Sequence, residues 1–477
     1  MYKDVLNLMK DKKVFILVSD GSGLRNFLFT KFKAEGENSN YNLQYWNDTR
    51  FSLSDRFNCN EVSIATYKQN WQTLLFCRVR KRIELNVLTK KFKDNVYQLY
   101  KFPLSYRSIN DFIKSTIINV FERLNSTEAG IKRIRKRIKT LERSTKKYAY
   151  CKQQLTTDKP DLVFCTNQRS TKMISAVLAA QDLGIPTVCF IHSWDNVPKA
   201  MNVIETDYYL VWSDLMKKEL LHYYPYIDES KVFVTGTPQF VPHYDRTLIK
   251  SRASFFNEYN LDVNKKYVCY SGDDITTSPL DQYYLEDLTN AVRNLNNKGE
   301  NIGIIYRKCP VDFTDRYDEV LKNNKDLIIK IDPIWEQVGD MWSEIIPTVE
   351  DFSLLANICY HTELVTNVCS STVFDFVIHK KPCIYYNYEQ PQLKKGIRDI
   401  GQNYKYVHFR SMPSDAAVIW CKDKSELETK VFEVLKGERS NVSVGTQWYH
   451  NVVGQLPENA CATIWNALEH IILKTTI

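Results

Sequence analysis

One short segment of the chain gathers four side chains that can do acid–base or hydrogen-bonding chemistry. They follow the apolar run 187–191, and they are His192, Trp194, Asp195 and Asn196. A histidine near a carboxylate can take a proton from a hydroxyl group close to neutral pH. His192 and Asp195 are therefore candidate catalytic bases, with a purely structural histidine as the alternative. Trp194 and Asn196 are candidates for contacts with an acceptor.

A second loop follows the first apolar run of the sequence, 14–19. Asp20 offers a further carboxylate, and it is a third candidate for the base. The next three residues, Gly21, Ser22 and Gly23, allow a ligand to approach the backbone closely, because glycine has no side chain. They lack the third glycine of the dinucleotide-binding G-x-G-x-x-G pattern, so we expect an acceptor loop of unspecified partner.

The second half of the chain offers hydroxyl groups for a phosphate. Ser370, Ser371 and Thr372 stand where an expected strand runs into an expected helix. Backbone N–H groups and hydroxyls at such a place can bind an anion, and capping of the helix by a serine is the alternative. We expect these residues to bind donor phosphates together with Ser271 and Gly272, which follow another strand.

Charged and amide side chains near other strand ends complete the expected donor site. Arg307 and Lys308 end an apolar strand, where they can clamp a diphosphate or form a surface charge pair. Asp375 lies one turn into a helix and can accept hydrogen bonds from a ribose, or it is a plain surface carboxylate. Glu389 and Gln390 offer an acceptor beside an amide, a combination suited to sugar hydroxyls.

Several other chemistries lack their sequence signatures. The chain has no G-x-S-x-G, no Walker A loop, no H-E-x-x-H and no Asp-x-Asp. No His/Cys pairs occur at zinc-ligand spacing. We therefore expect no metal and no cofactor, with helix N-termini and cations stabilising the nucleotide diphosphate.

Alternating apolar runs and helical segments must position these residues. In the first half we expect strands at 14–19, 162–165, 187–191, 207–212 and 232–234. In the second half we expect strands at 267–270, 302–306, 327–331, 364–366 and 383–386. Helices between such strands, with short connections, are typical of parallel, doubly wound sheets. We expect residues 35–60 to be loop and residues 61–150 to be mainly helical.

The predicted fold class is α/β, with two Rossmann-like domains that face a cleft. Residues 1–245 form the expected first domain, with the helical region 61–150 inserted in it. Residues 246–477 form the expected second domain, which ends in an amphipathic helix. Ligands of parallel sheets bind beyond the carboxyl ends of the strands, which is where the candidate residues stand.

Length and charge narrow the class of protein further. The chain has 477 residues with 44% hydrophobic and 25% charged side chains, which is ordinary globular composition. Its net charge of +8 is unevenly spread, because residues 76–150 hold 20 Lys and Arg against 6 Asp and Glu, hence +14. One part of the molecule is thus built to meet anions.

The densest cationic segment is expected to be a helix. Ile131, Ile134, Ile138 and Leu141 fall on one stripe, and a candidate membrane or anion patch lies beside it, namely Arg133, Arg135, Lys136 and Arg137. A solvated surface helix is one interpretation, and an anionic membrane surface or a nucleic acid are the others. Nucleic-acid binding is disfavoured, because no RNA- or DNA-binding motif accompanies the charge.

The expected location is the cytoplasm, with peripheral attachment to the inner face of the cell membrane. The apolar runs are too short to span a bilayer. Charged residues interrupt the first 13 residues, so we expect no secretion signal. Twelve scattered cysteines without paired spacing suit free thiols in a reducing compartment.

Three segments in this order resemble a known family: Phe-Ile-His-Ser-Trp-Asp-Asn at 190–196, Tyr-Leu-Val-Trp-Ser at 209–213 with Val-Phe-Val-Thr-Gly-Thr-Pro at 232–238, and 364–382 with Ser-Ser-Thr and Lys-Pro. The chain resembles GT-B glycosyltransferases of bacterial surface-polysaccharide synthesis, including CDP-glycerol glycerophosphotransferase-like relatives. The resemblance covers roughly residues 160–400.

The resemblance implies transfer of a sugar from a nucleotide-sugar in the C-terminal domain to an acceptor in the N-terminal domain. Residues 370–372 then match the phosphate-binding helix start, and Arg307 matches a basic residue at the donor. Residues 389–390 match a region that contacts the donor sugar, and His192 or Asp195 takes the place of the base.

The predicted function is metal-independent transfer of a sugar to a cell-envelope or capsular glycan. The expected partners are a nucleotide-sugar donor, a glycan or lipid-linked acceptor and an anionic membrane surface, with no nucleic acid. The alternatives are a CDP-linked polyol-phosphate transferase and a catalytically silent binding protein of the same fold.

Overall fold

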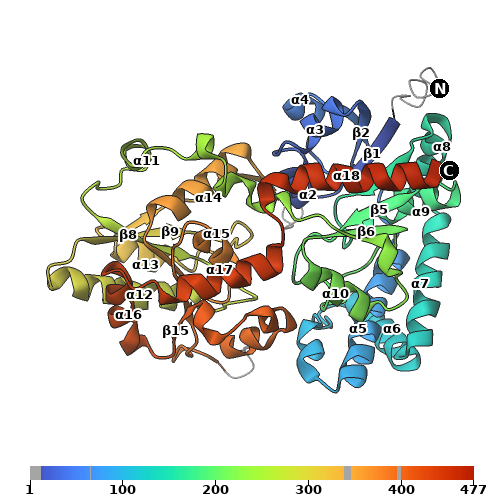
Figure 1. The fold of residues 1–477 in the computed structure, drawn as a ribbon. Coiled ribbons are helices and arrows are strands. Elements are labelled where there is room, and N and C mark those ends of the chain that lie inside the picture. Colours follow the sequence, from blue (N-terminus) through green and yellow to red (C-terminus); the bar gives the residue numbers. More distant parts are fainter. Residues whose placement is uncertain (1–11, 65, 338–344, 395–398, 477) are drawn as a thin grey trace. The chain divides into compact units, whose positions relative to one another are not determined.

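Two compact units make up the chain (Figure 1). The first unit comprises Met1–Pro238 and Val453–Ile477, and the second comprises Gln239–Val452. The fold is that of a computed structural model, which describes residues 12–64, 66–337, 345–394 and 399–476. Residues 1–11, whose charges speak against a secretion signal, lie outside the described residues.

A parallel sheet forms the core of the first unit. Its described strands run in the order β3-β2-β1-β4-β5-β6-β7, and every pairing is parallel. The strands are β1 (Lys12–Val18), β2 (Tyr41–Asn47), β3 (Asn60–Ser63), β4 (Leu162–Cys165), β5 (Thr187–Phe190), β6 (Tyr208–Val211) and β7 (Val232–Val234). The run Val14–Val18 has no exposed surface. This is expected of a central parallel strand, which is covered on both faces.

Helices connect these strands in the manner of a doubly wound fold. They are α2 (Gly21–Phe27), α3 (Phe32–Asn38), α4 (Ser54–Phe57), α9 (Ile174–Asp182) and α10 (Asp214–Tyr223). The strand order runs outward in both directions from β1 and β4, so the crossovers before and after this point lie on opposite faces of the sheet. The prediction of a Rossmann-like first domain is confirmed.

The expectation of a loop at 35–60 is wrong. This segment contains most of α3, all of β2 and α4, and the first residue of β3. In β2, the buried Tyr41, Leu43 and Tyr45 alternate with the exposed Asn42 and the partly buried Gln44. Such alternation marks a strand with one side toward solvent. The high asparagine content hid the pattern.

A helical insertion lies between β3 and β4, as the sequence predicted. It consists of α5 (Trp71–Phe92), a short 3₁₀ helix (Asn95–Tyr100), α6 (Ile109–Asn125), α7 (Glu128–Arg143) and α8 (Lys146–Asp158). Each α-helix begins at a residue whose side-chain oxygen accepts a hydrogen bond from the first turn, namely Asn70, Ser108, Thr127 and Thr145. Such caps satisfy N–H groups that have no partner within the helix.

The C-terminal helix α18 (Pro457–Thr476) packs in the first unit, whereas the sequence assigned it to the second. The indole of Trp465 stacks on Phe32 and Tyr41 with ring centroids 4.8 Å away in both cases, and its N–H donates to the carbonyl of Phe32 at 2.8 Å. The division of the chain also falls after Pro238 and not at residue 245. The apolar stripe of this helix, seen in the sequence, does not by itself specify which of the two units the helix packs against.

The second unit has its own parallel sheet. Its described strands run in the order β10-β9-β8-β13-β14-β15. They are β8 (Lys266–Ser271), β9 (Ile302–Arg307), β10 (Ile328–Lys330), β13 (Leu364–Asn367), β14 (Cys383–Tyr386) and β15 (Ile419–Cys421). A separate antiparallel pair is formed by β11 (Trp335–Gln337) and β12 (Ile345–Pro347). A second Rossmann-like domain is thereby confirmed.

The helices of the second unit pack around this sheet. They are α11 (Arg252–Glu258), α12 (Asp281–Asn297), α13 (Asp318–Asn323), α14 (Val349–His361), α15 (Thr372–Val377), α16 (Leu427–Leu435) and α17 (Ser440–Val453). Among the described residues of both units, no helix combines the length and the apolar character that a membrane crossing requires.

Candidate functional site

The strand order of the first sheet reverses between β1 and β4, which is where doubly wound sheets bind ligands. Asp20 follows β1, and Asn167 follows β4. The amide of Asn167 donates to the carboxylate of Asp20 at 2.7 Å. His192 follows β5, the neighbour of β4 in the sheet. The first-half candidates therefore stand at adjoining strand ends.

The carboxylate of Asp20 is occupied by hydrogen-bond donors. One oxygen caps α2 by accepting the backbone N–H groups of Ser22 at 3.1 Å and Gly23 at 3.2 Å. The other oxygen accepts the hydroxyl of Ser19 at 3.0 Å and the amide of Asn167. This geometry gives Asp20 a structural role at the start of α2.

The electrostatic surroundings of Asp20 agree with that role. Burial on its own raises the pKa of Asp20, but the charges of His192 and Arg169 and the hydrogen bonds from Gly23 and Asn167 outweigh it. The pKa therefore lies below its usual value. Asp20 is therefore an ionised carboxylate, and both of its oxygens already accept hydrogen bonds.

Asp195 is also engaged. One carboxylate oxygen accepts the hydroxyl of Ser193 at 2.6 Å and the amide of Asn196 at 2.7 Å. The other oxygen forms an ion pair with Lys199. These contacts fold the loop that follows His192, and they leave Asp195 less suited to take a proton.

His192 is held neutral. Burial and the charge of Arg169 lower the pKa of its imidazole to about 4, although the charge of Asp20 opposes them. Its backbone N–H donates to the side-chain carbonyl of Gln168 at 2.8 Å. Within the described chain, His192 is the one candidate base whose side chain has no hydrogen bond. A neutral imidazole can accept a proton.

The loop residues Trp194 and Asn196 are packed inside the first unit, with 7% and 3% of their surface exposed. The amide of Gln168 donates to the side-chain oxygen of Asn196 at 3.1 Å. Both residues are therefore held by packing inside the first unit, and their contact with an acceptor stays a prediction.

The glycines of the first loop also have a packing role. Gly21, Ser22 and Gly23 form the first turn of α2. A Cβ atom added to Gly23 would lie 2.6 Å from Oγ1 of Thr166 at the end of β4. The close approach that needs glycine here is that of α2 to β4.

Cations that the sequence analysis did not assign to a site lie near this strand end. Burial and the charges of Arg80, Lys199 and Arg169 lower the pKa of Lys81 to about 8. Arg169 lies four residues after the end of β4, so its position near a strand end was a usable signal. Lys81 comes from α5, and only the tertiary structure brings it here.

In the second unit, the strand order reverses between β8 and β13. The hydroxyls of Ser271 and Thr372 are 3.4 Å apart across this point, and the hydroxyl of Ser370 lies 2.8 Å from that of Thr372. Ser371 is exposed at the start of α15 and makes no side-chain cap. The structure thus brings three of the predicted phosphate-binding hydroxyls together.

Asp273, in the loop after β8, and Asp281, at the start of α12, form a pair of carboxyl groups that the sequence analysis missed. Asp281 accepts the hydroxyl of Tyr317 at 2.6 Å and the backbone N–H of Asp273 at 3.1 Å. Burial and the charges of Asp281 and Asp274 raise the pKa of Asp273 well above its usual value. The protonated form of Asp273 is favoured beside Gly272. Two acids directly after a strand were the available signal.

Arg307 forms a buried ion pair. One nitrogen of its guanidinium lies 2.8 Å and 3.0 Å from the two carboxylate oxygens of Asp351 on α14. Asp351 also accepts the indole N–H of Trp335 at 2.6 Å. Lys308 donates to the carbonyl of Thr314 at 2.7 Å. These partners make both cations structural links between β9 and its neighbours, in place of the diphosphate clamp expected from the sequence.

Asp375 is bound to a histidine. Its carboxylate lies 2.8 Å from Nε2 of His243, and Nδ1 of the same imidazole lies 3.0 Å from Nε2 of His379. Burial and the neighbouring His243 lower the pKa of His379 to about 3. Asp375 is thus not the plain surface carboxylate that was the alternative to a ribose contact.

The dipeptide after β14 has two different environments. Gln390 is buried and donates to Asp287 at 2.7 Å. Glu389 accepts the backbone N–H of Ile400 at 3.0 Å. Burial and a hydrogen bond with Asp399 raise the pKa of Glu389 to about 7. Glu389 can therefore donate or accept a proton near neutral pH.

The predicted cationic patch on α7 is split by burial. Arg133, Lys136 and Arg137 are exposed, whereas Arg135 is buried. The guanidinium of Arg135 lies 3.2 Å from the carboxylate of Glu84 and 3.2 Å from that of Glu205. Arg135 therefore cannot contact a membrane, because the two acids neutralise it inside the first unit.

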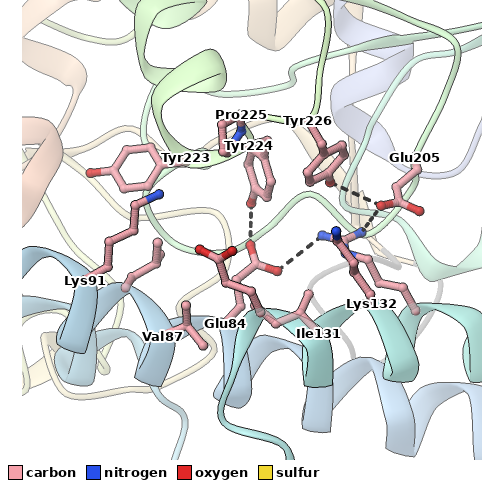
Figure 2. A pocket seen from close by; sticks show the side chains of 13 residues that line it. Glu84, Val87, Lys91, Ile131, Lys132, Glu205, Tyr223, Tyr224, Pro225 and Tyr226 are labelled. Atoms are coloured by element: carbon pink, nitrogen blue, oxygen red, sulfur yellow. Dashed lines mark hydrogen bonds and ion pairs between the residues drawn. The ribbon is translucent and has the colours of Figure 1, made fainter.

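Figure 2 shows the pocket of about 290 Å³ beside this ion pair, between α5, α7 and residues 223–226. The hydroxyl of Tyr224 donates to Glu84 at 2.7 Å, and that of Tyr226 donates to Glu205 at 3.1 Å. The polar groups at the floor of the pocket bind one another, as expected of a buried structural network.

Comparisons with known proteins place the fold. No protein-family model and no curated protein sequence matches the chain. A UDP-GlcNAc 2-epimerase from Methanocaldococcus jannaschii is 14% identical with a TM-score of 0.52, over 96% of this chain and 99% of that one. A glycosyltransferase from Rickettsia africae is 12% identical with a TM-score of 0.52, over 98% and 99% of the two chains. A putative UDP-N-acetylglucosamine 2-epimerase from Listeria monocytogenes is 11% identical with a TM-score of 0.52, over 97% and 96%.

At this level of identity, the likeness concerns the fold. The chain has the GT-B architecture of two Rossmann-like domains, which confirms the predicted fold class. The narrower resemblance to CDP-glycerol glycerophosphotransferase-like proteins receives no support from these structures.

Proposed function

We propose that this protein is a glycosyltransferase that moves a sugar from a nucleotide-sugar to a cell-envelope or capsular glycan. The cluster of hydroxyls from Ser271, Ser370 and Thr372 carries the proposal, because it lies at the β8–β13 reversal of a GT-B fold. The names of the similar structures, a glycosyltransferase and UDP-GlcNAc 2-epimerases, favour a nucleotide-sugar as the ligand.

The donor phosphates are bound by hydroxyls and by the backbone of the loop after β8. The raised pKa of Asp273 supports this assignment, because a neutral carboxyl does not repel a diphosphate. No metal and no cofactor takes part in the proposed reaction. Arg307 and Lys308 act by holding the strand end in place.

His192 is the proposed base on the acceptor side. Asp20 and Asp195 are already occupied by donors, whereas the neutral imidazole of His192 can receive the acceptor proton. The cations Arg169 and Lys81 near this strand end favour an acceptor that carries negative charge.

Epimerisation of a nucleotide-sugar is the second candidate, because two of the similar structures have that activity in their names. The two reactions differ in one product. Transfer releases the nucleotide, whereas an epimerase ends with the nucleotide still attached to the sugar. A CDP-linked polyol-phosphate transferase and a catalytically silent binding protein of the same fold are the third and fourth candidates.

One assay separates these candidates. The purified chain is incubated with UDP-, GDP- and CDP-linked donors, with and without cell-envelope glycan and in the presence of EDTA, while free nucleotide and sugar configuration are followed. Release of UDP or GDP that depends on the acceptor supports the proposal. Release of CMP indicates polyol-phosphate transfer, a change of configuration without release indicates epimerisation, and binding without turnover indicates a silent protein.

The second part of the proposal is peripheral attachment to the cytoplasmic face of the membrane. The excess of +14 in residues 76–150 supports it, with Arg133, Lys136 and Arg137 exposed on α7. Each cation near an anionic bilayer contributes about 1 kcal/mol. Attachment by these residues alone is expected to disappear at high salt.

A further inference from the structure

Helix α6 (Ile109–Asn125) is inverted relative to an ordinary surface helix. Its buried residues are Ser115, Ile118, Glu122 and Asn125, of which three are polar. Large apolar side chains lie on the opposite side, with exposed fractions of 81% for Ile109, 57% for Phe112, 50% for Ile113, 48% for Val120 and 74% for Leu124. A surface helix normally buries its apolar face and exposes its polar one.

The exposed apolar residues share one face of the helix. Ile109, Ile113, Val120 and Leu124 follow one another at intervals of four, seven and four residues, so they lie within about 60° of each other around the helix. Phe112 extends this face at one side. Its ring contacts that of Tyr106 with centroids 6.0 Å apart.

The segment that leads into α6 enlarges the apolar face. Phe102 is 65% exposed and Tyr106 is 53% exposed. Contiguous apolar surface of this kind is uncommon on monomeric proteins, where it marks an interaction site.

The orientation of α6 is fixed by its polar side. Glu122 forms ion pairs with Arg82 and with Lys101, the latter at 2.8 Å, and it accepts the amide of Asn86 at 2.9 Å. The hydroxyl of Ser115 donates to the carbonyl of Ser105 at 2.6 Å. Because these groups are buried and paired, rotating α6 to hide its apolar face breaks them.

The charges around the apolar face are mostly positive. Arg107, Lys114 and Arg123 are exposed on or beside α6. The acids of this segment are engaged, since Asp111 accepts the hydroxyl of Ser105 at 3.0 Å and Glu122 is buried.

The neighbouring face of α7 adds further cations. Arg133, Lys136 and Arg137 line a groove of about 490 Å³ together with apolar residues, among them Phe121 of α6 and Leu141. This groove borders α6 at Phe121 and Asn125, so these cations lie beside the helix that carries the apolar face.

We infer that α6 inserts its apolar face into an anionic bilayer, with the surrounding Arg and Lys side chains at the lipid phosphates. A helix with an apolar face flanked by cations is suited to lie in the plane of a membrane interface. A second copy of the chain fits less well, because a symmetric dimer places the same cations against one another. The inference rests on the proposed membrane attachment and not on the proposed sugar transfer.

Insertion predicts a component of binding that salt does not remove. The full chain is sedimented with vesicles of phosphatidylcholine alone and with added phosphatidylglycerol, at low and high salt. The double variant Phe112→Ser with Leu124→Ser should bind the anionic vesicles about a hundredfold more weakly, since two large apolar side chains no longer leave water. Val263→Ser, which changes an exposed apolar residue of the second unit, is the matched control and should bind as the unchanged chain does.

Three results overturn the inference: no binding of the unchanged chain to anionic vesicles, equal binding of the double variant, or loss of all binding at high salt. Light scattering tests the other occupants. If the unchanged chain is a dimer and the double variant is a monomer, the apolar face binds a second copy of the chain. If the chain binds an acidic protein and no vesicles, the face binds a protein partner. Either outcome also overturns the inference.

The substituted side chains are exposed, so the double variant should keep the melting temperature of the unchanged chain. Should it fail to fold, Leu124→Ser alone gives the same test with about a tenfold effect. Vesicle binding without turnover on any donor contradicts the proposed function and leaves insertion standing. Turnover on a short soluble acceptor without vesicle binding contradicts insertion and leaves the proposed function standing.

Discussion

The side-chain amide of Asn167 donates a hydrogen bond of 2.7 Å to the carboxylate of Asp20, which joins the ends of β4 and β1 where the strand order reverses. This bond, with the N–H groups of Ser22 and Gly23, uses the carboxylate to hold the start of α2. Asp20, the acid at this strand end, therefore has a structural role. Proton transfer at this strand end falls to the neighbouring histidine.

Replacing His192 should therefore lower turnover. We expect His192→Ala to reduce kcat by about a hundredfold or more, with donor affinity kept, because general-base catalysis contributes about that much. The exposed His222→Ala is the matched control in the same unit and should turn over normally. Unchanged turnover in His192→Ala transfers the role to Asp195 or Asp20.

The pH dependence of the reaction tests the same assignment separately. The pKa of His192 is lowered to about 4, so its imidazole stays neutral and able to accept a proton from there up to neutral pH. The profile of kcat/KM should show its acid limb near that pKa. A limb near the ordinary histidine pKa of about 6.5 contradicts the structural environment of His192.

On the donor side, the paired hydroxyls of Ser271 and Thr372 should bind phosphate. The double variant Ser271→Ala with Thr372→Val should bind UDP, or whichever nucleotide the unchanged chain binds, about thirtyfold more weakly, since each of the two lost hydrogen bonds costs about 1 kcal/mol. Calorimetry measures the affinity. Ser443→Ala removes an exposed hydroxyl from α17 and is the control. Equal affinity in the double variant excludes the β8–β13 reversal as the nucleotide site.

The sheets of both units were predictable because their strands are short apolar runs bounded by turns. Val14–Val18 and Ile302–Tyr306 are buried along their whole length, which gives a signal that needs no knowledge of neighbours. By contrast, β2 alternates buried and exposed residues, and its asparagines made it look like a loop. Helix α18 matched either unit by its stripe, and only the stacking of Trp465 on Phe32 decides between them.

The position of the candidate site was predictable, but the state of its side chains was not. Strand ends placed Ser271 and Thr372 together. Whether a charged residue is free or paired depends on partners far away in the sequence: Arg307 meets Asp351, which lies 44 residues later. A single sequence without its fold cannot reveal such pairs.

The pair of Glu389 and Asp399 predicts an effect of pH on stability. Because the pKa of Glu389 is raised to about 7, above its ordinary value of 4.5, the folded state holds this proton more tightly than the unfolded state does. Its contribution to stability is full below pH 4.5 and is lost as the pH rises through 7.

Glu389→Gln removes this ionisation while keeping an oxygen for the N–H of Ile400. The melting temperature of Glu389→Gln relative to the unchanged chain should therefore be higher at about pH 8 than at about pH 5. Glu433→Gln, which changes an exposed acid of the same unit, is the control. If the melting temperatures of Glu389→Gln and the unchanged chain differ by the same amount at both pH values, Glu389 and Asp399 do not share a proton.

The last prediction concerns two neighbouring cations on α7, of which one is buried and the other is exposed. Arg135 is enclosed between Glu84 and Glu205, whereas Lys136 points to solvent (Figure 2 shows the acids and the tyrosines that hold them). Removing one partner of a buried ion pair leaves a charge without compensation, which costs about 3 kcal/mol. Arg135→Met should therefore lower the free energy of unfolding by about that amount, measured by urea denaturation.

Lys136→Met is the matched control for this loss. It removes the same charge from the adjacent position, and it should change the free energy of unfolding by less than about 0.5 kcal/mol, as exposed substitutions usually do. The two variants should differ in the opposite way toward anionic vesicles, where only Lys136→Met reduces the electrostatic attachment of the folded protein. If both variants unfold at the same urea concentration as the unchanged chain, Arg135 does not form the buried ion pairs that we describe. The patch of four exposed cations predicted from the sequence is then the better description.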